Sequence, residues 1–375
     1  MAPVIKALRE QQGLSLTVCA TAQHRQMLDQ VLRAFDLRVD VNLDIMRPNQ
    51  SLAQITSRTL EGLGALLEDI KPAWLVVQGD TTTAFAAALA GYYNRVAVAH
   101  VEAGLRTNQK YSPYPEEVNR RAIAVLADAH FAPTQSAREN LLRENVPSER
   151  IWVTGNTGID ALHQASALLE ARSEMAADIS RRFSFLTESK KLILLTAHRR
   201  ESFGAPLEKV CIAVREIVRT RSDIQVVYPV HLNPNVRGPV ERLLAKATVH
   251  PAVEEQAGCG GGTLHLLEPV DYFALVYLLK RACLVLTDSG GIQEEAASLG
   301  KPVLVLRENT ERPEGVQAGV AKAVGTEPSS ITANVVRLLD NPSDYQRMAR
   351  STAVYGDGRA AQRILDVLKT LHPAH

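Results

Sequence analysis

The chain has 375 residues and a formal net charge of +1, and 46% of its residues are hydrophobic while 22% are charged. This length favours two globular domains, and the near-zero charge argues against nucleic acid or an anionic membrane surface as a partner. The four cysteines lack metal-ligand spacing, and no segment has the length of a membrane span or the pattern of a signal peptide. We therefore expect a cytoplasmic protein with reduced thiols, no metal site and no membrane association.

Strands and helices are predicted to alternate along the chain in two sets. In the first set we expect helices over 3–11, 21–35, 51–70, 81–93, 117–127 and 136–144, and strands over 14–20, 74–77, 96–99, 129–131 and 151–153. A helix over 158–171 and a polar stretch over 172–191 lead into the second set. There we expect strands over 191–196, 224–230, 281–287 and 303–306, and helices over 207–219, 292–299, 330–339, 342–349 and 359–371. This alternation predicts an α/β protein of two doubly wound domains with parallel sheets, facing each other across a cleft.

Acidic residues follow the two central strands of the first set. Asp80 comes after the strand over 74–77 and Glu102 after the strand over 96–99, while Glu116 and Glu117 lie in the next Pro-bounded loop. Ligands of an open α/β sheet bind beyond the carboxyl ends of its strands, so we expect these acids on one edge. Acids gathered there suit proton transfer. The alternatives are that Asp80 caps the following helix and that the glutamates are ordinary loop residues.

The second set carries a pattern for binding phosphate. A predicted strand runs into Ser289, Gly290 and Gly291, and a helix follows, so backbone N–H groups at the helix start can approach an anion. Glu295 lies one turn into that helix, where it could accept hydrogen bonds from a ribose diol. The alternative is a glycine-containing turn without a ligand. Because no strand is followed by G-x-G-x-x-G and no Walker motif is present, a nicotinamide cofactor is not indicated.

Basic side chains follow two other strands of the second set. His198, Arg199 and Arg200 come after the strand over 191–196, and His231 comes after the next strand. A single histidine at such a place is usually structural. Beside two arginines and a phosphate site, His198 is instead suited to stabilising or protonating a departing diphosphate.

Eight segments in this order resemble a known family. They are Gln78–Thr83, His100–Thr107, Ser112–Glu117, Gly155–Asn156, His198–Ser202, Tyr228–His231, Asp288–Glu295 and Glu311–Glu314. Together they are similar to the non-hydrolysing UDP-N-acetylglucosamine 2-epimerases, which have the GT-B fold. The resemblance covers nearly the whole chain. It implies an isomerase without a cofactor that interconverts UDP-N-acetylglucosamine and UDP-N-acetylmannosamine for bacterial surface polysaccharides.

The resemblance also implies roles for the matching residues. Asp80, Glu102 and Glu116 would be the acid/base carboxylates, and His198 would assist the departure of UDP. The substrate-binding residues would be Arg120, Arg199, Ser289, Gly290, Gly291, Glu295 and Arg312. The loop over 268–272 would contact uracil, and the segment over 247–264 is an insertion relative to the family pattern. Some relatives bind a second UDP-N-acetylglucosamine as an activator at positions that match Gln23, Gln26, Arg58 and His231.

The reaction explains why these groups are needed. The proton at C2 of the sugar is not next to a carbonyl, so its direct removal would leave an unstabilised carbanion. Elimination of UDP across C1 and C2, followed by re-addition, avoids this carbanion. This route requires carboxylates on both faces of the ring and stabilisation of the diphosphate. A GT-B glycosyltransferase with a UDP-sugar donor and a non-catalytic nucleotide-sugar sensor remain alternatives.

The resemblance further predicts the domain limits and the assembly. The expected domains are residues 1–156, with a C-terminal helix over 357–372 packed back onto them, and the UDP-binding residues 157–356. Family members are homodimers, so we expect one here. Relatives begin with a strand and a Gly-Thr-Arg-Pro-Glu turn that this sequence lacks. We expect that Met1 is an internal residue of a longer protein; the alternative is a degenerate relative.

Overall fold

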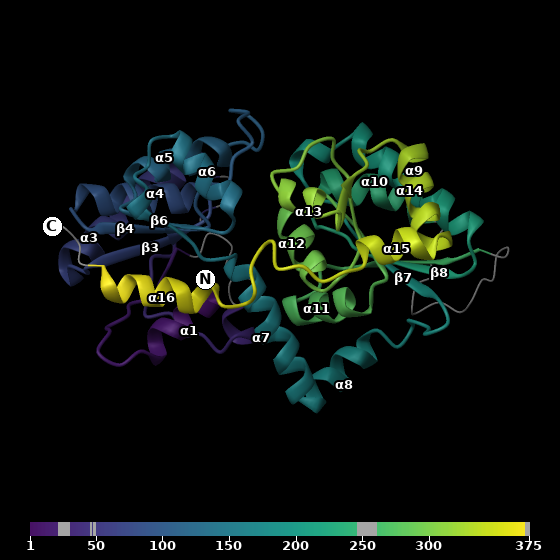
Figure 1. The fold of residues 1–375 in the computed structure, drawn as a ribbon, viewed down its shortest axis with the longest axis horizontal. Coiled ribbons are helices and arrows are strands. Elements are labelled where there is room, and N and C mark those ends of the chain that lie inside the picture. The colour runs from purple at the N-terminus through teal and green to yellow at the C-terminus, as the bar shows by residue number, and fades with distance from the viewer. Residues whose placement is uncertain (22–30, 46, 48–49, 246–260, 372–375) are drawn as a thin grey trace. The chain divides into compact units, whose positions relative to one another are not determined.

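The computed structural model describes residues 1–21, 31–45, 47, 50–245 and 261–371 (Figure 1). The chain forms two compact units. Unit 1 consists of Met1–Ala161 and Tyr355–His375, and unit 2 consists of Leu162–Val354. Each unit contains a parallel β-sheet with helices around it, so the predicted α/β class with parallel sheets is confirmed. No helix among the described residues is both long and apolar enough to cross a membrane.

The main sheet of unit 1 has four parallel strands in the order β3-β4-β5-β6. Their bounds are β3 Trp74–Gln78, β4 Ala97–Val101, β5 Ala129–Ala132 and β6 Ile151–Val153. The strands β1 Cys19–Ala20 and β2 Val41–Asn42 pair with each other in a separate parallel sheet. Central strand β4 is buried along its whole length, because helices cover both faces of the sheet.

The helices of unit 1 divide between these two faces. Helix α1 (Ala2–Glu10) and helix α16 (Ala360–Thr370) lie side by side and pack against β4 and β5, although they come from opposite ends of the chain (Figure 1). Helices α4 (Thr82–Tyr93) and α5 (Glu116–Leu126) cover the other face, and α3 (Leu52–Ile70) packs on α4. Helix α6 (Gln135–Arg143) contacts β5 and β6, a short 3₁₀ helix (Ser148–Arg150) precedes β6, and α7 (Thr157–Ala171) begins at the end of the unit.

Unit 2 has a six-stranded parallel sheet in the order β12-β11-β10-β7-β8-β9. Its strands are β7 Lys191–Thr196, β8 Ile224–Pro229, β9 Thr263–Leu267, β10 Leu284–Thr287, β11 Val303–Val305 and β12 Ala321–Ala323. Strands β7 and β10 occupy the centre, and their side chains are almost entirely buried. The carboxyl ends of these two strands therefore lie next to each other in the middle of the sheet, where Thr196 pairs with Thr287.

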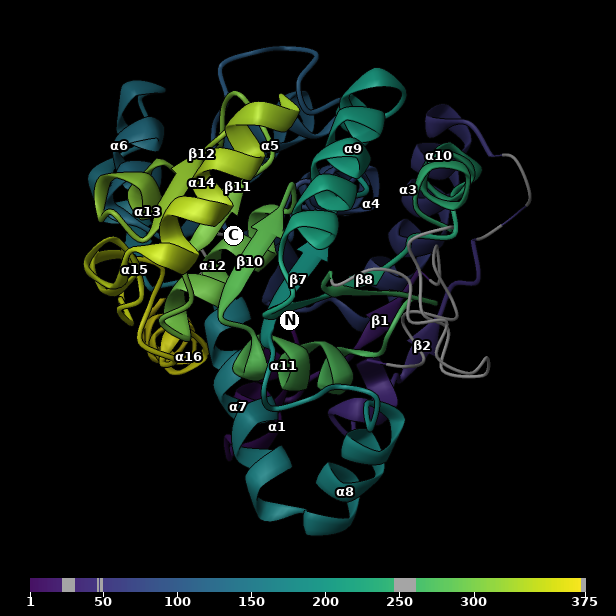
Figure 2. The same cartoon turned by 90° about the vertical axis from the view of Figure 1, so that its right-hand side faces the viewer.

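Helices cover both faces of this sheet as well. The helices of unit 2 are α8 Ser173–Arg182, a short 3₁₀ helix Arg200–Ser202, α9 Ala205–Thr220, α10 Pro234–Leu244, α11 Tyr272–Arg281, α12 Gly290–Ser298, α13 Pro313–Gln317, α14 Pro328–Asp340 and α15 Pro342–Met348. Helices α9, α10 and α14 pack together over one face and form the largest apolar core (Figure 2). Helices α11 and α12 contact β7, β10 and β11.

The structure contains several elements that the sequence does not predict: β2, α10, β9, α13, β12 and the two short 3₁₀ helices. It differs from the predicted elements in three further places. The polar stretch over 172–191 contains helix α8. Only Ile179 of this helix is buried, so most of its side chains are polar and face solvent. The strand expected over 14–20 is limited to Cys19–Ala20. Tyr272, assigned to a nucleotide-binding loop, is instead the first residue of α11, where Asp271 accepts a hydrogen bond from the backbone N–H of Ala274 as its N-cap.

Candidate functional site

In unit 1, Asp80 follows β3 and forms an ion pair with a buried arginine. Its Oδ2 lies 2.6 Å from Nη2 of Arg120, whose side chain is 5% exposed. The alternative that Asp80 caps α4 is wrong, because Thr81 is the N-cap and its hydroxyl accepts a hydrogen bond from Ala84 N–H. Arg120, which was expected to bind substrate, is thus paired with Asp80.

Glu102 lies beyond the last residue of β4 in a left-handed backbone conformation, with φ at +64°. Non-glycine residues rarely adopt this conformation, and such outliers cluster at functional sites. The Glu102 carboxylate accepts a hydrogen bond from Nε2 of Gln78 at 3.4 Å, and Gln78 is the last residue of the neighbouring strand β3. Glu102 and Asp80 therefore lie at the same edge of the sheet, as predicted from their positions after adjacent strands.

Glu116 and Glu117 begin α5 but have different environments. Glu117 is 1% exposed, and its two carboxylate oxygens accept hydrogen bonds from the backbone N–H groups of Thr107 and Asn108, each at 3.0 Å. One oxygen of Glu116 is buried without a hydrogen-bond partner among the described residues. Glu116 is four residues before Arg120, which places both on the same face of α5. The structure thus brings Asp80, Glu102 and Glu116 to one region of unit 1.

Two buried histidines lie on neighbouring strands of the unit 1 sheet. His100 on β4 is paired in register with His130 on β5, and its Nε2–H donates to the carbonyl of Gly79 at 2.8 Å. Burial lowers the pKa of His100 to about 4, and burial together with His100 lowers that of His130 to about 3. Both rings are therefore neutral near pH 7 and act as parts of the scaffold.

In unit 2, the predicted phosphate-binding turn joins β10 to α12. Ser289 is the N-cap of α12 and makes no side-chain cap hydrogen bond, while Gly290 and Gly291 are the first helical residues. A side chain at Gly290 would lie 2.9 Å from Glu311 Oε1, whereas one at Gly291 would meet no atom within 4 Å. The space beside Gly291 leaves the start of α12 accessible to an anion.

A network of arginines and glutamates lies against this helix start. Arg312 forms ion pairs with Glu294 and Glu311, and Glu311 also pairs with Arg307 at 2.5 Å and with Arg199 at 3.4 Å. Although burial alone would raise the pKa of Glu311, the three guanidinium groups lower it to about 2. Glu311 therefore remains charged and fixes the arginines beside Gly290.

His198 is positioned by Asp288, a residue of the motif Asp288–Glu295 for which the sequence alone predicts no role. Asp288 follows β10, is fully buried, and its Oδ2 accepts the backbone N–H groups of His198 and Arg199, each at 2.8 Å. The ring of His198 stacks on that of His231, with centroids 5.6 Å apart. Burial lowers the pKa of His198 and outweighs the opposing effect of Asp288. The signal for Asp288 in the sequence is its position directly after a strand, like that of Asp80.

Glu295 is buried on α12 and accepts a hydrogen bond from the hydroxyl of Tyr272 at 2.9 Å. Burial raises the pKa of Glu295 to about 7, with a smaller contribution from Glu294, and Tyr272 acts in the opposite direction. This carboxyl group consequently changes charge near neutral pH.

The residues expected to bind an activator do not form one cluster within a unit. Arg58 lies on α3 of unit 1, where its Nη1 is buried without a hydrogen-bond partner among the described residues. His231 belongs to unit 2 and stacks on His198. Gln23 and Gln26 lie outside the described residues. No group of three or more His, Cys, Asp or Glu side chains within the described ranges is arranged to hold a metal ion.

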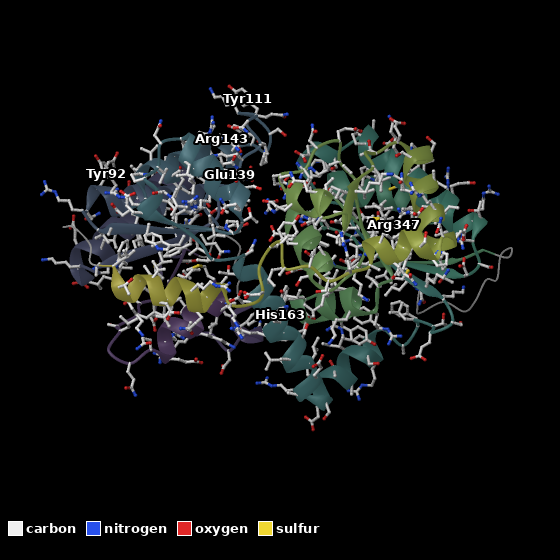
Figure 3. All side chains as sticks on the ribbon, viewed as in Figure 1. Tyr92, Tyr111, Glu139, Arg143, His163 and Arg347 are labelled. Carbon is white, nitrogen blue, oxygen red and sulfur yellow. The ribbon has the colours of Figure 1, made fainter. Side chains whose placement is uncertain are left out.

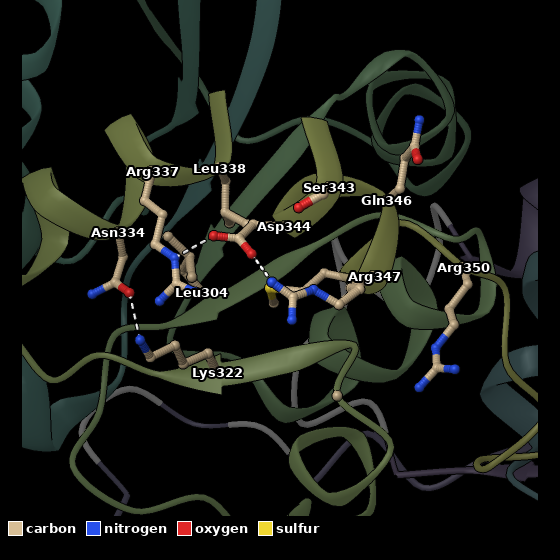
Figure 4. Close-up of a pocket in the computed structure, with 12 residues that line it drawn as sticks. Leu304, Lys322, Asn334, Arg337, Leu338, Ser343, Asp344, Gln346, Arg347 and Arg350 are labelled. Atoms are coloured by element: carbon tan, nitrogen blue, oxygen red, sulfur yellow. Dashed lines mark hydrogen bonds and ion pairs between the residues drawn. The ribbon is translucent and has the colours of Figure 1, made fainter. Parts of the chain in front are cut away.

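A cavity of about 970 Å³ lies elsewhere in unit 2, beside β12, α14 and α15 (Figure 4). Four cationic side chains line it, but Arg337 and Arg347 both bind the carboxylate of Asp344. These two arginine side chains are 58% and 72% exposed, so they are largely solvated. None of the predicted site residues lines this cavity.

The fold and these site residues define a class: a protein of two α/β units, each with a parallel sheet, and with a GT-B-like fold. One unit carries carboxylates at its strand ends, and the other carries a glycine-containing helix start. Residues 6–369 match the family model described as UDP-N-acetylglucosamine 2-epimerase. The chain therefore belongs to the UDP-N-acetylglucosamine 2-epimerase family.

Individual relatives agree with this assignment. The chain is 52% identical to the UDP-N-acetylglucosamine 2-epimerase of Yersinia pestis, over 98% of this chain and 94% of the relative. The UDP-GlcNAc 2-epimerase of Neisseria meningitidis, solved with UDP-GlcNAc bound, superposes with a TM-score of 0.92 at 45% identity and covers 99% of this chain and 96% of its own. The enzyme of Methanocaldococcus jannaschii, solved with UDP-GlcNAc and UDP, gives a TM-score of 0.82 at 30% identity, with 98% and 95% covered.

Proposed function

We propose that this protein interconverts UDP-N-acetylglucosamine and UDP-N-acetylmannosamine, supplying the latter for surface polysaccharide synthesis. The observation that carries the proposal is the position of Asp80 and Glu102 after adjacent strands at one edge of the unit 1 sheet, with Glu116 at the start of α5, in a chain matched to this family over nearly its whole length. The family match by itself points to UDP-N-acetylglucosamine as the substrate, but it does not explain the reaction. The carboxylates support the chemistry, because epimerisation at C2 requires groups that remove and return a proton.

The proposed reaction has two halves. In the first, a carboxylate takes the C2 proton, the C2–H electrons form the C1–C2 double bond, and the C1–O bond breaks to release UDP. In the second, UDP adds back to C1 after a carboxylic acid delivers a proton to the opposite face of C2. Glu102 and Glu116 are proposed as proton-transfer groups together with Asp80. Both halves pass through the same unsaturated sugar, so no net oxidation occurs.

Unit 2 is proposed to hold the nucleotide. The backbone N–H groups at the start of α12 would receive the diphosphate, because a helix N-terminus favours negative charge. Arg199 and Arg312 would add positive charge beside it, and His198 would stabilise or protonate the departing phosphate oxygen. Glu295 would accept hydrogen bonds from the ribose hydroxyls.

Solvent exchange tests the proposal directly. The protein is incubated with UDP-N-acetylglucosamine in deuterated water without any acceptor, and both sugar nucleotides are analysed by NMR and mass spectrometry. We expect both epimers to acquire deuterium at C2. UDP release that depends on an added acceptor would instead indicate a glycosyltransferase, and nucleotide-sugar binding without exchange would indicate a sensor.

A homodimer is proposed on the basis of an exposed apolar surface on unit 1. Tyr92 and Tyr93 at the end of α4 are 62% and 67% exposed, and Val125 on the adjacent α5 is 86% exposed (Tyr92 is labelled in Figure 3). Clustered apolar groups of this kind often mark protein interfaces. Sedimentation should show a dimer that the substitutions Tyr93→Ser and Val125→Ser together convert to a monomer; a wild-type monomer would contradict the proposal.

A second UDP-N-acetylglucosamine is proposed as an activator, acting through Gln23, Gln26, Arg58 and His231. The buried Nη1 of Arg58, without a hydrogen-bond partner in the described residues, is the structural support for this role. Cooperative substrate kinetics that become hyperbolic in Arg58→Met would agree with it. Hyperbolic kinetics in the unaltered protein would remove it.

A further inference from the structure

Helix α5 carries three polar side chains that are almost completely buried. Glu117, Asn119 and Arg120 are 1%, 7% and 5% exposed, respectively. Burial of charged and amide groups is costly unless each has partners. The partners of these three residues therefore show which segments α5 holds in place. They lie at two places, in the segments that follow β3 and β4.

The first place is Asp80, which α5 holds through both its side chain and its backbone. Arg120 Nη2 lies 2.6 Å from Asp80 Oδ2, and Asn119 Nδ2 donates to the Asp80 carbonyl at 2.9 Å. These two contacts fix the carboxylate and the peptide group that carries it.

The second place is the loop between Glu102 and Glu116. Glu117 accepts the backbone N–H groups of Thr107 and Asn108 at 3.0 Å each, and its Oε2 lies 3.4 Å from Arg120 Nη1. Because the loop starts at Glu102 and ends at Glu116, a fixed point in its first half restrains the path between these two residues.

We propose that Glu117, Asn119 and Arg120 form a support that positions the three carboxylates Asp80, Glu102 and Glu116 and does not itself bind substrate. The inference rests on the proposed function for its catalytic consequence. It revises the role expected for Arg120, because its guanidinium is 5% exposed and lies between Asp80 and Glu117, so it presents little surface to a sugar nucleotide.

A double-mutant cycle separates positioning from substrate binding. In this cycle kcat and KM are measured for Arg120→Met, for Asp80→Asn and for the double variant. If Arg120 acts through Asp80, Arg120→Met should lower kcat about 100-fold with the KM for UDP-N-acetylglucosamine within about 3-fold of wild type. Added to Asp80→Asn, it should lower kcat by no more than about 3-fold further. Multiplicative losses, or a loss confined to KM, would overturn the proposal and return Arg120 to substrate binding.

Two matched variants control this cycle. Arg121→Met removes the adjacent arginine, which is 52% exposed and pairs with Glu144, and it should leave kcat unchanged. Arg120→Lys keeps the positive charge but loses the simultaneous contact with Asp80 and Glu117. It should therefore recover part of the kcat that Arg120→Met loses. It also provides the comparison if Arg120→Met does not fold. Unchanged kcat in both Arg120 variants would contradict the proposal.

Amide hydrogen exchange tests the support independently of activity. Glu117→Gln replaces one acceptor oxygen with an amide donor, so exchange at Thr107 and Asn108 should accelerate at least 10-fold, while exchange within β4 should be unchanged. The control Glu139→Gln changes an exposed residue of α6 and should alter neither amide. Unchanged exchange in Glu117→Gln would refute the support even if the protein is an epimerase. Accelerated exchange in a protein without epimerase activity would uphold the support and refute the proposed function.

Discussion

The two units differ in the charged groups that lie at the ends of their parallel strands. In unit 1, the buried Arg120 pairs with two carboxylates, those of Asp80 and Glu117. In unit 2, Arg312 and its neighbours are paired with glutamates, and Glu311 alone contacts three guanidinium groups. The acids of unit 1 outnumber their cationic partner, whereas the charges of unit 2 are nearly balanced.

This difference shows how similar folds acquire different roles. A glutamate fixed by three arginines, such as Glu311 with its pKa of about 2, stays charged and holds those arginines in place. A carboxylate such as Glu116, which has an oxygen without a hydrogen-bond partner among the described residues, is available to exchange a proton. This contrast agrees with the proposed division of function, with proton transfer in unit 1 and nucleotide binding in unit 2.

The largest expected effect comes from removing a proton-transfer group in unit 1. Glu102→Gln or Glu116→Gln should lower kcat by about 10²–10⁴-fold, because an amide cannot exchange a proton, while the affinity for UDP remains unchanged. Steady-state kinetics and calorimetry with UDP measure the two quantities. The exposed Glu139 of α6 provides the control variant Glu139→Gln (Figure 3). Near-normal turnover in Glu116→Gln would exclude it from proton transfer.

Substitution of Arg312 tests whether the arginine–glutamate network of unit 2 stabilises the fold in addition to binding ligand. In Arg312→Met, Glu294 and Glu311 lose a buried partner, so the free energy of unfolding should fall by about 3–5 kcal/mol and UDP affinity should also decrease. Urea unfolding and calorimetry give both values. Arg219→Met, an exposed pair with Glu216 on α9, should change neither. An unchanged free energy of unfolding in Arg312→Met would mean that the network does not stabilise the fold.

The pH dependence of stability should also distinguish the units. The pKa of His100 is about 4 when folded and about 6.5 when unfolded, so the unfolded chain binds more protons between these values. Unit 1 should therefore lose roughly 3 kcal/mol from His100 alone as the pH falls from 6.5 to 4. Glu295, with a raised pKa of about 7, acts oppositely and stabilises unit 2 as the pH falls from 7 towards 4.5.

Scanning calorimetry at several pH values measures this contrast. We expect the transition of unit 1 to shift to lower temperature in acid more than that of unit 2, and His100→Gln to reduce the shift. His163→Gln, at an exposed histidine of α7, is the control (Figure 3). Equal acid shifts in His100→Gln and the unaltered protein would show that His100 is not responsible.

Two adjacent glycines give the smallest and most local test. An alanine at Gly290 would place its Cβ 2.9 Å from Glu311 Oε1, so Gly290→Ala should destabilise the protein by about 1–3 kcal/mol. An alanine at Gly291 would meet nothing within 4 Å, so Gly291→Ala should keep the stability and lower UDP affinity about 10-fold by blocking the anion. Unchanged UDP affinity in Gly291→Ala would place the diphosphate elsewhere.

The sequence alone determined the α/β class, most of the helices and strands, and the sets of residues at the strand ends. These features depend on local patterns: apolar runs predict buried strands, and Asp80 and Glu102 follow the ends of such strands within two residues. Helix α8 escaped prediction because it buries only Ile179, so the apolar pattern that indicates a helix is weak there.

Only the tertiary structure decided which of these residues act on which partners. Thr81 rather than Asp80 caps α4, Glu102 adopts a left-handed conformation, and Asp288 holds the backbone of His198. The Thr81 cap is a local contact with Ala84. Asp288 and Arg120 instead contact segments distant in the sequence, and Arg120 pairs with Asp80 across 40 positions. Local propensity contains no information about such contacts, because they form only when the sheet brings its strand ends together.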